Sequence, residues 1–121
     1  EAETAGAKFV PPDLVRNSPG VAKAWAYISV WGGGSASTLA DSYNVDSAAD
    51  DGAGLTTLTW TTDFATEDTY INGGWSSEGR IVNQVGAATQ AVGSSQFTVV
   101  VSDSGSRTDG VPTLIIAWGD Q

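Results

Sequence analysis

Residues 23–31 read Lys-Ala-Trp-Ala-Tyr-Ile-Ser-Val-Trp, and the alternation of their side chains decides the fold class. In a β-strand, successive side chains point to opposite faces, so residues two apart share a side. One side of this stretch carries Lys23, Trp25, Tyr27, Ser29 and Trp31, and the other carries Ala24, Ala26, Ile28 and Val30. Both sides are largely apolar, whereas a sandwich strand commonly exposes one face to water. We therefore expect a strand that is covered on both sides, by its own core and by another layer.

Short strand patterns continue along the chain, at residues 42–45, 55–62, 69–71, 79–85, 88–92, 96–102 and 113–118. Turn sequences separate them, namely Gly32-Gly33-Gly34, Asp51-Gly52, Asn72-Gly73, Gly93-Ser94 and Asp109-Gly110. No stretch after residue 20 has a helical period. The pattern predicts an all-β fold, a small antiparallel β-sandwich-like domain over residues 21–121.

Residues 1–20 differ in character from the rest. They contain Phe9-Val10-Pro11-Pro12 and then Pro19-Gly20, and proline fixes φ and removes a backbone donor. We expect an extended arm or linker that joins the domain to something upstream. The sequence starts at Glu1 and contains no Met, so we expect either a processing site or a fragment boundary there. No apolar run approaches the length of a membrane helix, and no membrane insertion is expected.

The charge balance excludes several partners. Fourteen acidic residues against five basic ones give a net charge of −9, and the five cations are scattered along the sequence. A polyanion would be repelled, so neither nucleic acid nor an anionic lipid surface is an expected partner. Cysteine and histidine are both absent, which removes disulfides, thiolate metal sites and the usual general base near neutral pH.

Aspartates are the candidates for a metal site. Carboxylate ligands for Ca²⁺ could come from Asp41, Asp46, Asp50, Asp51 and Asp63. No EF-hand spacing is present and Asp51-Gly52 is a natural turn, so solvated turn carboxylates are the favoured interpretation. We expect no metal and no cofactor.

No constellation for catalysis stands out. The acidic pair Glu67-Asp68 is adjacent in sequence, whereas the two carboxylates of a glycosidase lie across a cleft. The serines lack both a Gly-x-Ser-x-Gly elbow and a histidine base. The prediction is a binding module and not an enzyme.

The five tryptophans divide into two groups. Trp25, Trp60 and Trp118 fall within predicted strands, where packing in the core or at a subunit interface is favoured. The candidate interface residues are Trp25, Tyr27, Trp31 and Trp118. Trp75 instead follows Asn72-Gly73-Gly74, which predicts a flexible polar loop. There it could stack on a sugar ring or lie under its own loop; the candidate ligand-binding residues are Tyr70, Asn72, Trp75 and Arg80.

Several motifs occur in a particular order. Val21-Ala22-Lys23-Ala24-Trp25 follows Pro19-Gly20; then come Ser42-Tyr43-Asn44-Val45, Asp51-Gly52-Ala53-Gly54, Leu58-Thr59-Trp60-Thr61-Thr62 and finally Trp118-Gly119-Asp120. Over residues 9–121 this order resembles the C-terminal domain of bacteriophage tail-fibre and related virion-fibre proteins. The stretches 32–40 and 75–93 look longer than is usual for that family.

The resemblance implies a homotrimeric fibre tip on a virion, attached through the N-terminal arm to an upstream fibre or virion protein. Its expected role is multivalent adhesion to a host-surface glycan. A neighbouring chain would then cover the second apolar side of residues 23–31. Two alternatives stay open. One is a head-fibre or decoration protein with mainly an assembly role. The other is a carbohydrate-binding module of a secreted hydrolase, expected as a monomer with a flat row of exposed aromatics.

Overall fold

A computed structural model describes residues 18, 20–30, 37–66, 71–76, 80–85, 91–101, 104–109 and 112–119 of the chain; the side chains of residues 71–75 and 101 are outside that description. The strands are β1 (Ala22–Val30), β2 (Thr38–Tyr43), β3 (Val45–Gly52), β4 (Leu55–Trp60), β5 (Ile71–Ser76), β6 (Arg80–Gln84), β7 (Ser94–Val101) and β8 (Thr113–Trp118). Nothing in the described part of the chain is helical, so it has no helix that could cross a membrane. The predicted all-β class is confirmed.

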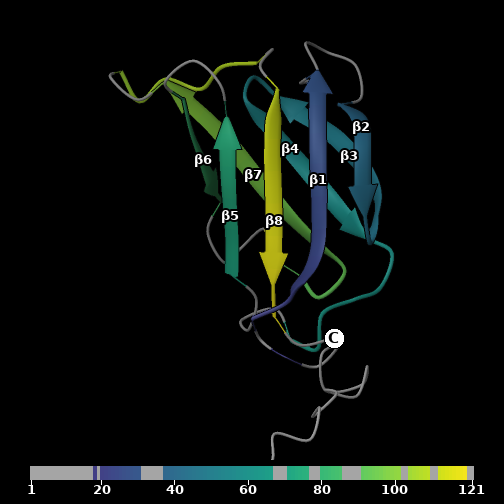
Figure 1. Ribbon diagram of the computed structural model, residues 1–121. Helices are drawn as coiled ribbons and strands as arrows, with labels where there is room; N and C mark the ends of the chain where they lie inside the picture. Colours follow the sequence, from purple (N-terminus) through teal and green to yellow (C-terminus); the bar gives the residue numbers. More distant parts are fainter. Residues whose placement is uncertain are drawn as a thin grey trace, which may run out of the picture.

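The strands form two four-stranded antiparallel sheets that pack face to face (Figure 1). The front sheet, nearer the viewer in Figure 1, has the order β2-β1-β8-β5, and the back sheet has the order β3-β4-β7-β6. The chain changes sheet between β2 and β3, β4 and β5, β5 and β6, and β7 and β8. This arrangement confirms the predicted β-sandwich.

The core lies between the sheets. The front sheet contributes alanines and isoleucines, and the back sheet contributes the aromatic side chains. The front sheet contributes Ala24, Ala26, Ile28, Ile115 and Ala117, and the back sheet contributes Ala48, Leu58, Trp60, Phe97 and Val99. The Trp60 ring meets Phe97 edge-on at a centroid distance of 6.5 Å, and it meets Phe64 at 5.6 Å. Full burial of a Leu or Phe side chain stabilises a fold by about 1.5–3 kcal/mol, so these residues dominate its stability.

The inner side of β1 matches the predicted alternation. Ala24, Ala26 and Ile28 are fully buried, while Trp25 and Tyr27 on the other side are half-buried. The alternation is interrupted at Lys23, where the pairing of β1 with β8 shifts register between Ala22 and Ala24. Such a bulge places an extra residue against the partner strand and bends the chain locally. Lys23 is accordingly buried, with 5% of its surface exposed.

The strand predicted at residues 42–45 is only partly confirmed: residues 42, 43 and 45 lie in strands, but the chain turns at Asn44 and divides them between two strands. β2 ends at Tyr43, β3 begins at Val45, and Asn44 between them has a φ of 55°. Asparagine tolerates this left-handed conformation better than most residues. The Asn44 side chain also donates to the Thr62 carbonyl at 3.1 Å and accepts from the Thr62 amide at 2.6 Å.

The turn predicted at Asn72-Gly73 is also wrong. Both residues lie within β5, opposite Ala117 and Ile116 of β8. Strand propensity depends on the neighbouring strands, and here pairing with β8 outweighs the turn preference of the local sequence. The strand predicted at 88–92 falls partly on residues 86–90, outside the described residues, and Val92-Gly93 form a turn closed by the Ala91–Ser94 bridge.

The predicted turn at Asp51-Gly52 is displaced: both residues lie in β3, which ends at Gly52 with a φ of 121°, and the turn itself is Ala53-Gly54. The glycine run at 32–34 lies outside the described residues, as does almost all of the expected arm at 1–20. The division into arm and domain therefore stays a prediction.

Candidate functional site

One broad outer surface of the sandwich is apolar. The register places Tyr43 of β2 opposite Trp25 of β1, and Trp25 and Tyr27 opposite Ile116 and Leu114 of β8. Residues directly opposite one another in an antiparallel pair share a face. Trp118, two positions beyond Ile116, lies on the same side of β8. We call this surface the apolar face, formed by Trp25, Tyr27, Tyr43, Leu114, Ile116 and Trp118.

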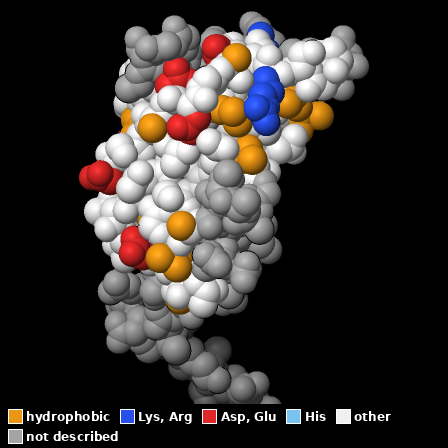
Figure 2. Space-filling view, turned by 180° about the vertical axis from the view of Figure 1, so that it is seen from behind, with side chains coloured by type: hydrophobic (Ala, Val, Ile, Leu, Met, Phe, Trp, Pro, Cys, Tyr) orange, Lys and Arg blue, Asp and Glu red, His pale blue; other side chains and the backbone are white. Residues whose placement is uncertain are grey.

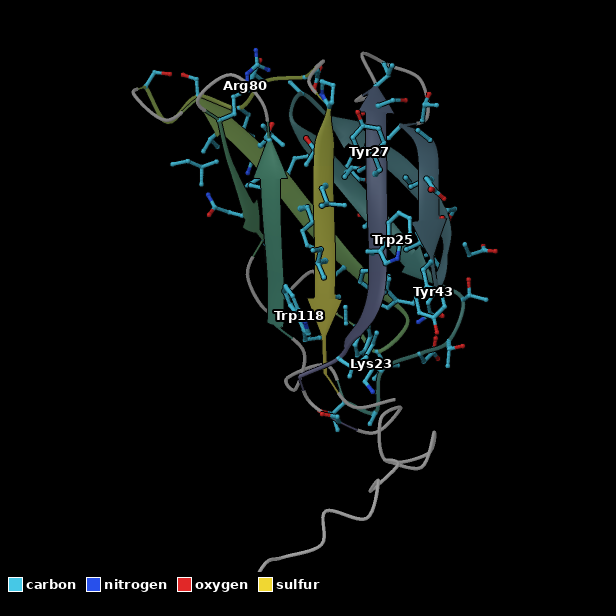
Figure 3. The ribbon with its side chains drawn as sticks, viewed as in Figure 1. Lys23, Trp25, Tyr27, Tyr43, Arg80 and Trp118 are labelled. Atoms are coloured by element: carbon cyan, nitrogen blue, oxygen red, sulfur yellow. The ribbon has the colours of Figure 1, made fainter. Side chains whose placement is uncertain are left out.

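Figure 3 shows the labelled aromatic members of the apolar face on the side of the front sheet that is turned away from the back sheet. Tyr43 is the most open of them, with 58% of its surface exposed, and the other five are half-buried. The backbone of β5 extends the same surface, because positions 71, 73 and 75 pair with Trp118, Ile116 and Leu114. The described side chains of the face lie on β2, β1 and β8, and the backbone of β5 lies alongside them.

The outer surface of the back sheet has a different character. Its central strands carry polar side chains at outward positions, including Thr57, Thr59, Ser94 and Gln96. The Asp51 carboxylate accepts hydrogen bonds from the Thr57 hydroxyl at 2.5 Å and from the Gln96 amide at 2.8 Å. Figure 2 shows this side, where acidic side chains are spread among small groups of hydrophobic atoms. The outer surfaces of the two sheets thus differ in polarity.

Negative charge is placed away from the centre of the apolar face. Of the carboxylates in the described residues, Asp46, Asp50 and Asp51 lie on β3 of the back sheet, and Asp63 and Asp109 lie in connections. Asp41 lies on β2, opposite Tyr27, at the edge of the front sheet. The strongly acidic chain therefore keeps an uncharged centre on this one surface.

A hollow of about 510 Å³ opens at the end of the sandwich where β1 begins and β2 ends. It is lined by Val21, Ala22, Lys23, Tyr43, Asn44, Thr61 and Thr62. Tyr43 belongs both to this hollow and to the apolar face, so the two surfaces are continuous. Figure 3 shows Lys23 at this end of β1, below Trp25.

Hydrogen bonds between distant segments fix the wall of the hollow. The amide of Thr61 donates to the Asn44 carbonyl at 3.3 Å, in addition to the two bonds between the Asn44 side chain and Thr62. The residue that joins the two sheets is in this way tied to the segment that follows β4. The lining is therefore largely pre-formed.

Of the residues predicted to bind a ligand, only Arg80 has a described side chain, so their grouping stays a prediction. Tyr70 lies outside the described residues, as do the side chains of Asn72 and Trp75. The flexible loop predicted around Trp75 is wrong, since that residue is part of β5. Arg80 lies on β6 of the back sheet, where its guanidinium donates to the Asp109 carbonyl at 3.0 Å and lies 3.5 Å from the Thr108 hydroxyl. Arg80 thus helps to hold the segment before β8.

Three of the four residues predicted to form a subunit interface lie on the apolar face. Trp25, Tyr27 and Trp118 lie on one surface, and Trp31 is outside the described residues. Sequence reasoning missed Tyr43, Leu114 and Ile116. The alternation of Leu114, Ile116 and Trp118 was a usable signal for β8, whereas the single strand predicted at 42–45 concealed the role of Tyr43.

The carboxylates considered for Ca²⁺ are dispersed. Asp50 accepts from the Gly52 amide at 3.1 Å, and Asp41 accepts from the Ser42 amide at 2.9 Å, as turn and strand-end carboxylates do. Within the described ranges, no group of three or more acidic residues is arranged to hold a metal ion.

Comparison of the chain with protein-family models, with curated proteins and with solved structures found no match.

Proposed function

We propose that this chain is a non-catalytic binding domain of a virion fibre, which assembles as a homotrimer through the β1 and β8 part of the apolar face, with Tyr43 of the edge strand β2 left outside the contact, and adheres to a host-surface glycan. The observation that carries the proposal is the apolar face itself, with Leu114 and Ile116 at its centre and Trp25, Tyr27 and Trp118 around them. The number three and the location on a virion come from the resemblance of the motif order to virion-fibre domains.

The chemistry of the apolar face favours another copy of the chain as its occupant. Aromatic side chains are enriched and charged ones depleted at the cores of protein interfaces. Contiguous exposed apolar patches of more than a few hundred Å² commonly mark interaction sites. Each Å² removed from water contributes about 25 cal/mol, so burying such a surface favours association.

The charge distribution supports the same choice. Copies that each carry a net charge of −9 repel one another. Contact through the back sheet would bring the outward Asp51 carboxylates of the copies together, whereas Asp41, the described carboxylate on the side of the apolar face, lies at its edge opposite Tyr27. The uncharged centre of the front sheet is the surface on which approach costs least.

Assembly gives the adhesion its strength. A single shallow site binds weakly, but linked copies convert later binding events into intramolecular ones and can raise avidity by about 10²–10⁴. A fibre end that presents several identical sites therefore needs only a weak site on each chain.

A monomeric carbohydrate-binding module is the second candidate. The aromatic residues Trp25, Tyr43 and Trp118 on one face favour it, because such rings can stack on sugars. Leu114 and Ile116 on the same face count against it, since aliphatic side chains cannot form hydrogen bonds with sugar hydroxyls. A head-fibre or decoration protein would share the assembly contact and would lack binding to cells.

The native mass of the chain in solution tests the proposal. Light scattering coupled to size exclusion is expected to give about three times 12.4 kDa at high protein concentration and a smaller mass on roughly hundred-fold dilution. Ile116→Lys places a charge at the centre of the apolar face and should yield a folded monomer. The matched control is Thr57→Lys, at a half-buried outward position of the back sheet, which should leave the mass unchanged.

A folded wild-type monomer at every concentration would contradict the assembly and bring the carbohydrate-binding module forward. Labelled trimer that fails to bind candidate bacterial cells would contradict the adhesion and favour the purely structural virion role.

A further inference from the structure

Lys23 is in an unusual setting for a charged side chain. Only 5% of its surface is exposed, and within the described residues no hydrogen bond or ion pair reaches its ammonium group. The methylene stem of Lys23 is covered, while its nitrogen is not among the fully buried side-chain atoms without a partner, so the ammonium group keeps some access to solvent. Lys23 lines the hollow, and a bound anion there would supply the missing partner.

The hollow has the size of a small-molecule site, and its lining is mixed in polarity. Its volume of about 510 Å³ is within the usual range of about 300–1,000 Å³ for such sites. Thr61 and Thr62 are exposed on one side of it and Asn44 is held by its bonds to Thr62. A ligand that enters would find a fixed wall with hydroxyl groups and one positive charge.

Tyr43 adds an aromatic wall at the edge of the hollow. Its side chain is 58% exposed, although a phenol ring gains free energy when its faces are covered. The ring and Lys23 line the same hollow, from neighbouring strands of the front sheet. A ligand with an apolar ring face and a negatively charged substituent can satisfy both residues at once.

We infer that the hollow binds an acidic sugar residue, whose carboxylate pairs with the Lys23 ammonium and whose ring packs against Tyr43. Thr61 and Thr62 offer hydroxyl groups to the ring edge. A charge-assisted hydrogen bond to a carboxylate is about twice as strong as a neutral one, which sets acidic sugars apart from neutral sugars of the same shape. The inference rests on the proposed adhesion function and names the class of glycan.

The net charge of −9 affects the affinity for an anionic glycan. The field of the whole chain repels an anionic glycan at long range, so attraction must come from the local ammonium group. Affinity at one site is then weak and salt-dependent, and several sites on a fibre supply the avidity. The other carboxylate that could occupy the hollow is an aspartate or glutamate of a second copy.

The test is a titration of the isotope-labelled chain with methyl glucuronide, methyl galacturonide and N-acetylneuraminic acid, alongside methyl glucoside and methyl galactoside. Amide signals of Lys23, Asn44, Thr61 and Thr62 are expected to shift with at least one acidic sugar, at an affinity about ten-fold or more above its neutral counterpart. Lys23→Gln should remove that preference.

Two further variants keep the test decisive. Arg107→Gln removes the same charge from an exposed position outside the hollow and should leave the acidic preference intact. Tyr43→Ala changes an exposed side chain, so folding should be preserved. It should weaken the binding of acidic and neutral sugars to the same extent. Native mass is measured on every variant, so that loss of sugar binding is not confused with loss of assembly.

Equal affinity for acidic and neutral sugars, or an acidic preference that survives Lys23→Gln, would overturn the inference and leave adhesion standing. Absence of binding to every sugar, with no binding to cells, would overturn both. Shifts at the same amides that follow protein concentration and not sugar would assign the hollow to a carboxylate of a second copy, which also overturns the inference.

Discussion

Gly54 lies in the connection between β3 and β4 with a φ of +62°, and it is enclosed by backbone on several sides. Its amide donates to the Asp109 carboxylate and its carbonyl accepts from the Val99 amide at 2.9 Å. A Cβ at this position would lie 2.6 Å from the Thr108 nitrogen and 2.7 Å from the Val99 oxygen. These neighbours are main-chain atoms, which cannot move aside as a flexible side chain can.

Gly54→Ala is therefore expected to lower the free energy of unfolding by more than about 2 kcal/mol, because the left-handed conformation alone costs roughly 1–2 kcal/mol for a residue with a Cβ. Gly105→Ala is the matched control, with a φ of +68° and open space around its Cβ. The control should cost about 1 kcal/mol. Urea unfolding of both variants measures the difference, and equal losses would show that the crowding at Gly54 relaxes freely.

At the scale of the element, Asn44 makes the connection between β2 and β3 and so carries the chain from one sheet to the other. Asn44→Ala keeps the positive φ with a poorly suited residue and loses both side-chain bonds to Thr62. Each bond contributes about 0.5–1.5 kcal/mol, so a total loss of about 2–4 kcal/mol is expected once the backbone strain is added.

Asn44→Gly loses the same bonds without the backbone strain and should retain about 1 kcal/mol or more relative to the alanine variant. Thermal or urea unfolding separates the two effects. If glycine and alanine prove equally destabilising, strain at the positive φ contributes nothing to this connection.

The strands differ in how well local sequence predicted them. β8 and most of β1 alternate regularly, with alanines, Ile28, Ile115 and Thr113 inside and tryptophans outside, and both were predicted nearly to their ends. β5 contains Asn72-Gly73-Gly74, which locally favours a turn, and it is a strand because it pairs with β8 along its whole length. Pairing between segments about forty residues apart leaves no local signal of this kind.

Local sequence also predicted only part of the candidate site. Trp25, Tyr27 and Trp118 were predicted as a group, because aromatic residues at alternate positions of apolar strands indicate a second buried side. Arg80 was grouped with Trp75 for its closeness in sequence, yet the chain crosses to the back sheet between β5 and β6. The hollow was not predicted, since its lining comes from three separate segments.

At the scale of the whole molecule, the balance between apolar attraction and like-charge repulsion makes assembly sensitive to salt. Each copy carries a net charge of −9, and added salt screens the repulsion over a Debye length of about 10 Å at 0.1 M. Burial of the apolar face is not weakened by screening. Raising NaCl from low to physiological concentration is therefore expected to lower, several-fold, the protein concentration below which the assembly dissociates.

Light scattering across a dilution series at each salt concentration measures this effect, with sucrose at matched viscosity as a control for solvent changes. Weaker assembly at higher salt would mean that ion pairs hold the copies together. Lys23 and an acidic residue of a second copy would then be the first pair to examine.

The sequence by itself determined the all-β class, the apolar character of both sides of β1 and the excess of acidic residues, because these follow from side-chain alternation and composition within short segments. Only the tertiary structure decided that Trp25, Tyr43, Ile116 and Trp118 share one face and that Lys23 lies beside Asn44 and Thr61. Those placements depend on which strands pair. Strand pairing is settled by packing of the whole chain, since contacts distant in sequence gain their free energy only when both sheets close over a common core.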